Sequence, residues 1–172
     1  MLQCHWLINS LYLLFKGEIM THNNLSEKIR IVDLLREGKS VQLHPEGYSM
    51  YPLLVPERDE VIISPLKDHI IRRGDVLLYR RKSGRLILHR VYKKDRSRLY
   101  FVGDNESEIE GPVRITEVYA IMSAFYHKGK KYKTSNVFYF FYWQIWLLLL
   151  PFRKPIGNFI HKIKTKLINK RP

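Results

Sequence analysis

The feature that most constrains the fold is a succession of short β-rich runs between Val41 and Tyr126, interrupted by Pro, Gly and Asp. Runs of this composition and spacing predict a mainly antiparallel β domain. The segment shows no internal repeat and no alternation of strand and helix patterns, which argues against a parallel α/β fold. The predicted strands are Val41–Leu43, Val61–Ser64, Val76–Arg80, Leu86–Tyr92, Leu99–Val102 and Ile115–Tyr126.

A single helix is predicted in residues 20–40, ahead of the β domain at residues 41–126. Apolar side chains recur at helical spacing from about Leu25 to Glu37. Asn24 can cap the start of this helix, and Gly38 suits its C-terminal cap.

Residues 1–19 differ from the rest of the chain. They contain an apolar run but lack the positive segment and the small-residue cleavage site of a secretory signal. The triplet Lys16-Gly17-Glu18, just upstream of Met20, can be encoded by AAA-GGA-GAA, which resembles a bacterial ribosome-binding sequence. We therefore expect residues 1–19 to be a non-native or signal-like extension and Met20 to be the native start.

Basic charge is concentrated in the tail, residues 127–172. The chain of 172 residues carries a net charge of +14, and its tail holds eleven Lys and Arg with no Asp or Glu. Residues 1–126 then have 19 basic against 16 acidic residues, a net charge of +3. Such a tail indicates an anionic partner, either a lipid surface or nucleic acid. The single cysteine, Cys4, excludes an intrachain disulfide framework and a cysteine-based zinc site.

Within this tail, an apolar run extends from Val137 to Leu150 and is followed by a basic amphipathic pattern between Ile156 and Leu167. A helix of 14 residues reaches about 21 Å, which is short of the roughly 30 Å of a bilayer's hydrocarbon core. Together with a basic linker at 127–133, the pattern favours a helix in the membrane interface. The alternative is that the apolar run docks on the β domain and completes its core. Nucleic acid ranks third, because no nucleic-acid motif accompanies the charge.

Three positions are candidates for chemistry. Ser49 lies between Gly47 and Pro52 in a predicted turn, which can present its hydroxyl to a cleft. His89 shares a strand face with Ile87 and Val91, so it is expected to be partly buried and able to act as a general base. Taken singly, a turn serine and a core histidine are more often structural. The same holds for Asp104, which lies in a Gly-Asp-Asn turn and can orient a histidine.

In combination, these residues resemble a known family. Four boxes in this order are similar to those of the signal peptidase I and LexA-type serine peptidase superfamily: GYSMYPLL (47–54), RRGDVLLYRR (72–81), LHRV (88–91) and GDN (103–105). The resemblance covers about half of the chain, residues 41–126, and implies a mainly β, signal-peptidase/LexA-like domain. We expect this domain to follow the N-terminal helix and precede a helical basic-apolar tail.

The resemblance also implies the site. Ser49 matches the nucleophile, and its backbone N–H would form part of the oxyanion hole. His89 stands where bacterial members carry a lysine, which is the pattern of the endoplasmic-reticulum and archaeal branch. Asp104 falls where that branch places a supporting aspartate. No cofactor or metal is implied. Arg90 and the pair at 72–73 are interpreted as solvated or structural.

Two departures from the family affect the functional prediction. Some relatives carry a hydroxyl donor two residues before the nucleophile, where this chain has Gly47. Signal peptidases usually have an N-terminal membrane anchor and an outward-facing site, whereas here the membrane element is C-terminal. Its basic flanks predict membrane association with the β domain on the cytoplasmic face. Residues 20–40 are too short for the DNA-binding domain of a LexA-type repressor.

The leading hypothesis is therefore a serine endopeptidase with a Ser49/His89 dyad, cleaving signal- or leader-like polypeptides near a membrane. One alternative is a catalytically silent module of the same fold that binds an extended peptide. Another is a membrane-surface or nucleic-acid-binding protein that acts through its basic tail.

Overall fold

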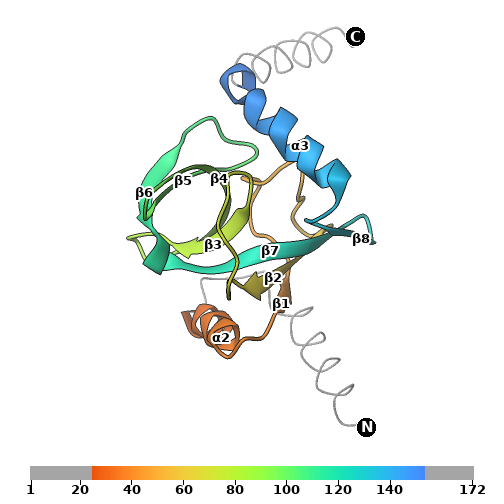
Figure 1. Cartoon of the computed structure of the whole chain (residues 1–172). Coiled ribbons are helices and arrows are strands. Elements are labelled where there is room, and N and C mark those ends of the chain that lie inside the picture. The colour runs from red at the N-terminus through yellow and green to blue at the C-terminus, as the bar shows by residue number, and fades with distance from the viewer. Residues whose placement is uncertain (1–24, 154–172) are drawn as a thin grey trace, which may run out of the picture. The chain divides into compact units, whose positions relative to one another are not determined.

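The computed structural model describes residues 25–153 (Figure 1). The described residues divide into two units after Arg30, and the β domain belongs to the second. The predictions for residues 1–19, for Met20 and for the amphipathic pattern at 156–167 lie outside the described residues. The helices are α2 (Leu25–Arg36) and α3 (Val137–Leu148), with short 3₁₀ turns η1 (Ile115–Glu117) and η2 (Leu150–Phe152). The strands are β1 (Val41–Leu43), β2 (Glu60–Pro65), β3 (Val76–Arg80), β4 (Leu86–Asp95), β5 (Arg98–Val102), β6 (Glu110–Arg114), β7 (Val118–His127) and β8 (Lys130–Lys133).

The strands form one antiparallel sheet of eight strands. Their order is β1-β2-β7-β3-β4-β5-β6, and β8 pairs with β7. Strands β3 to β6 are joined in sequence order, while β7 crosses back to lie between β2 and β3. The prediction of a mainly antiparallel β protein is confirmed.

The core has two main apolar clusters, one on each face of β3. Val76 and Leu78 join a cluster with residues of β2 and β7, whereas Leu77 and Tyr79 join a second cluster with β4, β5 and β6. All four side chains are buried. A strand covered on both faces is apolar at every position, which explains the unbroken apolar run in β3.

The part of α2 in the second unit packs through Leu35 into the first cluster. The chain then turns at Gly38, whose φ of +83° favours glycine. The backbone N–H groups of Gly38 and Lys39 bind the carbonyls of Leu35 and Leu34 at 3.1 and 3.0 Å. The predicted C-terminal cap is therefore present.

The segment 127–133, predicted as a linker, instead contains strand β8. Lys128 and Gly129 have φ values of +51° and +78°. Two consecutive positive φ angles form the tight turn that suits a two-residue hairpin, and His127 pairs with Lys130 across it. Strand β6 was also missed, because its Gly111-Pro112 pair is typical of a turn.

The apolar run at 137–150 forms α3, which docks on the β domain. The side chain of Asn136 caps its first turn by accepting a hydrogen bond from the Phe138 N–H at 2.8 Å. Tyr139 and Leu147 are its buried side chains. In the range 25–153, no helix has both the length and the apolar character needed to cross a bilayer.

Candidate active site

His89 is almost fully buried on β4, with 2% of its surface exposed. It faces the second cluster with Ile87 and Val91, as strand alternation predicts. Its ring meets the edge of Tyr79, with centroids 6.4 Å apart. The position of His89 is therefore fixed by the packing of the sheet.

Two carboxylates lie beside the two nitrogens of this ring. The Glu110 Oε2 atom is 3.9 Å from Nδ1, and the Glu106 Oε2 atom is 3.8 Å from Nε2. Nδ1 is buried and makes no hydrogen bond within the described part of the chain. A buried imidazole with a carboxylate beside each nitrogen can be oriented through one nitrogen and exchange a proton through the other.

Burial lowers the pKa of His89 below its ordinary value, because the charged imidazolium loses its hydration. The carboxylates of Glu106 and Glu110 oppose this effect, and the nearby guanidinium of Arg81 adds to it. The net direction is downward, which favours the neutral imidazole that can accept a proton.

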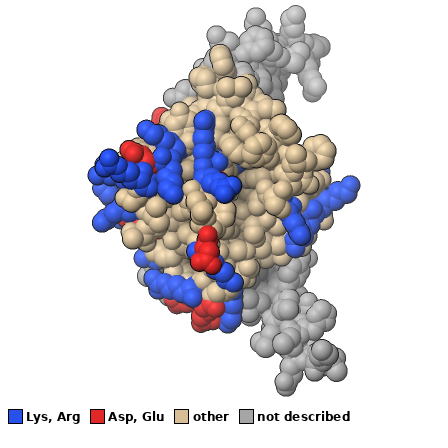
Figure 2. All heavy atoms as spheres, viewed as in Figure 1, with Lys and Arg blue, Asp and Glu red and all other residues tan. Residues whose placement is uncertain are grey.

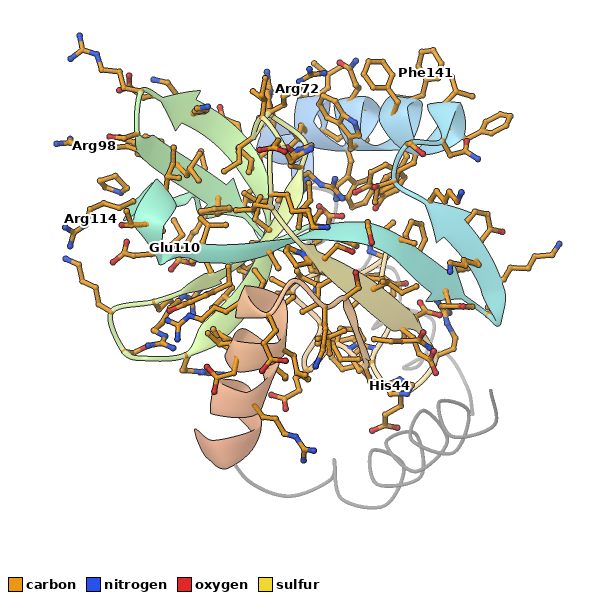
Figure 3. The ribbon with its side chains drawn as sticks, turned by 60° about the horizontal axis from the view of Figure 1, so that its bottom comes forward. His44, Arg72, Arg98, Glu110, Arg114 and Phe141 are labelled. Atoms are coloured by element: carbon orange, nitrogen blue, oxygen red, sulfur yellow. The ribbon has the colours of Figure 1, made fainter. Side chains whose placement is uncertain are left out.

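Glu110 is held in place on β6 (Figure 3). The Tyr79 hydroxyl donates to its Oε2 atom at 2.7 Å, and Arg81 donates to both oxygens at 2.5 Å. Burial opposes its ionisation, but these hydrogen bonds lower the pKa of Glu110. A fixed negative charge therefore faces Nδ1 of His89.

Ser49 lies in the turn between β1 and β2, against the loop that carries Glu106. Its backbone oxygen accepts a hydrogen bond from the Asn105 N–H at 2.8 Å. A Cβ atom at Gly103 would lie 2.7 Å from that oxygen and 2.9 Å from the Glu106 carboxyl group. Ser49 and His89 are thus both adjacent to the 103–106 loop. Among residues 25–153 the structure gives no hydrogen bond between the Ser49 hydroxyl and His89.

Asp104 is not placed against His89 as expected. Its carboxylate instead pairs with the neighbouring residue Arg90, at 2.7 Å to Nε and 2.6 Å to Nη2. The physical reason is strand alternation, because Arg90 points to the sheet face opposite to that of His89. Arg90 is fully buried, which makes it structural rather than solvated.

The sequence reasoning missed Glu106 and Glu110. The available signal was the density of acidic residues directly after the GDN box, at Glu106, Glu108 and Glu110. No cluster of three or more His, Cys, Asp or Glu in the described ranges is arranged to hold a metal ion.

Helix α3 and Arg153, which follows η2, hold the 103–106 loop from its other side. The indole N–H of Trp146 donates to the Asp104 carbonyl at 2.8 Å. Arg153 donates to the carbonyls of Gly103 and Glu106 at 3.0 and 2.8 Å. The loop between Ser49 and His89 therefore depends on the docking of α3.

Comparisons with known proteins do not assign the chain to a family. No protein-family model matches it, and a search of curated proteins found no match.

Proposed function

We propose that the chain is a serine endopeptidase with a signal-peptidase/LexA-like domain. Ser49 is the nucleophile, His89 is the general base, and Glu110 positions the imidazole. The observation that carries the proposal is the environment of His89. The ring is buried, which favours its neutral form, and it has a fixed carboxylate beside Nδ1 and turns Nε2 toward the loop that contacts Ser49.

In the proposed reaction, the Ser49 Oγ attacks the carbonyl carbon of a peptide bond while its proton passes to Nε2 of His89. The C–N bond then breaks, and His89 returns that proton to the leaving amine. Water attacks the acyl-enzyme while His89 takes a proton from the water, and His89 returns this proton to the Ser49 Oγ as the ester bond breaks. Glu110 stabilises the imidazolium that forms in both halves of the reaction.

This reaction requires the Ser49 hydroxyl to reach Nε2, which now faces Glu106 at 3.8 Å. The Glu106 side chain is 39% exposed and bound to the loop through its backbone, so it can rotate into solvent. Catalytic hydrogen bonds in free enzymes are often long and tighten when the substrate binds. A bound peptide would displace Glu106 and complete the Ser49–His89 contact.

The resemblance to signal peptidases supplies the proposed substrate class, which is a signal- or leader-like polypeptide with small residues before the cut. The test is incubation of the purified protein with a diverse peptide pool, read by mass spectrometry. Wild type and a Ser83→Ala control, altered at an exposed turn serine, should yield the same fragments. Ser49→Ala and His89→Gln should yield none. Fragments from all four proteins would contradict the proposal.

A second candidate is a peptide-binding module without catalysis. The observations that favour it are the unformed Ser49–His89 hydrogen bond and an apolar pocket of about 340 Å³ beyond the Ser49 turn, lined by residues that include Leu53, Phe125 and Tyr139. An extended peptide can pair with the edge of β1 that no strand within residues 25–153 occupies. Peptide capture that is equal for wild type and Ser49→Ala, with no fragments from either, would select this candidate.

A further inference from the structure

Helix α3 has an inward face that belongs to the fold. Tyr139 accepts a hydrogen bond from buried Arg90 at 3.0 Å, Trp146 binds the 103–106 loop, and Leu147 is buried. The ring of Trp143 fills the space above Gly74, where a Cβ atom would come within 2.5 Å of it. The docking of the helix is thus explained by this face alone.

The outward face is also apolar. Its exposed side chains recur every three or four residues, which places them along one stripe of the helix and the 3₁₀ turn after it. These residues, here called the α3 stripe, are Phe138, Phe141, Ile145, Leu148 and Phe152, with exposed fractions of 80%, 58%, 56%, 74% and 57%. Figure 3 shows Phe141 pointing away from the sheet.

No charged residue interrupts this surface, because residues 134–152 contain no Asp, Glu, Lys or Arg. A helix on the surface of a globular protein ordinarily carries polar residues on its outer side. In Figure 2 the surface where Figure 1 places α3 is largely free of charged side chains. Contiguous exposed apolar surface of this kind indicates an interaction site.

Basic side chains border the α3 stripe. Exposed lysines of β8 lie directly before the helix, at Lys130, Lys131 and Lys133. Exposed Arg72 and Arg73 precede Gly74, which touches α3 through Trp143. Figure 3 shows Arg72 beside the helix, and Figure 2 shows Lys and Arg where β8 lies. An apolar stripe with a basic border is complementary to a surface with apolar chains beneath anionic head groups.

We propose that the α3 stripe inserts into an anionic lipid surface, with the helix lying in the plane of the membrane interface. Its 12 residues extend over about 18 Å, which suits a helix lying in the interface rather than crossing the bilayer. The lysines of β8 and the arginines at 72–73 contact the lipid phosphates. This proposal does not depend on the peptidase proposal.

The first test is flotation of the full chain with vesicles, either of phosphatidylcholine alone or with added phosphatidylglycerol. Wild type should bind the anionic vesicles and lose binding as salt is raised. Phe141→Ser and Ile145→Ser should each reduce the partition coefficient by roughly tenfold, since each removes one inserted side chain. Ile70→Ser is the control, because Ile70 is 67% exposed on a loop outside the α3 stripe. Its binding should equal that of wild type.

The second test concerns charge. Replacing Lys130, Lys131 and Lys133 together by Gln should weaken binding to anionic vesicles by about 100-fold, because each lysine near the surface contributes roughly fivefold. The matched control replaces the exposed Lys82, Lys93 and Lys94 by Gln and should lose much less. Thermal unfolding of each variant confirms that it is folded.

Three outcomes would overturn the proposal. One is equal binding by the stripe variants, Ile70→Ser and wild type, which would assign lipid binding to another segment. The second is self-association that depends on the α3 stripe without vesicle binding, which would make the stripe a contact between copies. The third is binding to single-stranded DNA without vesicle binding, which would select nucleic acid as the anionic partner.

Discussion

Arg90 and Asp104 form a bidentate ion pair in the interior of the protein, with both side chains fully buried. Burial opposes the charge on Arg90, but the Asp104 carboxylate raises the pKa of the guanidinium above its ordinary value. The remaining Arg90 donors bind the Gly74 carbonyl and the Tyr139 hydroxyl, at 2.9 and 3.0 Å. The pair therefore joins the loop after β5, the turn before β3 and helix α3.

We expect Asp104→Asn to lower the free energy of unfolding by about 3–5 kcal/mol, because the buried guanidinium of Arg90 would lose its counter-charge. Urea denaturation measures this change. The matched control is Asp33→Asn, which breaks the exposed Asp33–Arg36 pair and should cost about 0–1 kcal/mol. If Asp104→Asn abolished peptide cleavage while leaving stability unchanged, Asp104 would act on His89 rather than on Arg90.

The same ion pair shows where the sequence stops being informative. Period-two alternation correctly placed His89 on the face of Ile87 and Val91, because one face of a strand is set by local geometry. The partner of Asp104 was not predictable in this way. Asp104 lies in the loop after β5. Whether its carboxylate contacts His89 or the adjacent Arg90 depends on which face of β4 this loop covers.

Strand and helix positions were predictable where apolar patterning is strong, as in β1 and β3. Strands β6 and β8 have mostly exposed side chains, so they lack the apolar alternation that identifies a strand. Glu110 was missed together with β6. The run at 137–150 was recognised as helical and apolar, but only the structure separates its docked face from its exposed one.

For the proposed active site, Glu110→Gln should reduce kcat/KM by at least about tenfold, with about 10⁴-fold as the upper limit known for the acid of a serine-protease triad. The change removes the negative charge beside Nδ1 of His89. Because that charge raises the pKa of His89, the acidic limb of the pH–rate profile should also move to lower pH. Steady-state kinetics on a peptide identified from the pool measures both effects.

Tyr79→Phe is the matched control for the Glu110→Gln variant. It removes the hydroxyl that donates to Glu110 but leaves the carboxylate and its contacts with Arg81. We expect a smaller loss of rate and an acidic limb close to that of wild type. If both variants lost activity equally with unshifted pH profiles, Glu110 would have only a structural role.

Glu106 is predicted to affect the pH dependence of the rate but, unlike Glu110, not the plateau rate. Its carboxylate, 3.8 Å from Nε2, raises the pKa of His89. Activity requires neutral His89, so the rate falls as pH drops through this pKa. Glu106→Gln lowers the pKa of His89, and the acidic limb should shift to lower pH without loss of the plateau rate. Glu57→Gln, at an exposed glutamate, should leave the profile unchanged, and a shift toward higher pH in Glu106→Gln would contradict the prediction.

Gly74 tests whether α3 must stay docked to keep the site assembled. Gly74 and Gly84 have similar positive φ values of +96° and +82°, so alanine costs about 1–2 kcal/mol of backbone strain at either position. Only at Gly74 does a new Cβ atom also collide with Trp143, at 2.5 Å, whereas nothing lies within 4 Å at Gly84. Gly74→Ala should therefore be less stable than Gly84→Ala by about 1–3 kcal/mol, as measured by urea denaturation.

The same pair of variants also tests the site. Since Trp146 of α3 and Arg153 after η2 hold the 103–106 loop, Gly74→Ala should also lose peptide cleavage at temperatures where both variants remain folded. Equal stability and equal activity of the two variants would show that the contact between Gly74 and Trp143 is not needed to hold the helix.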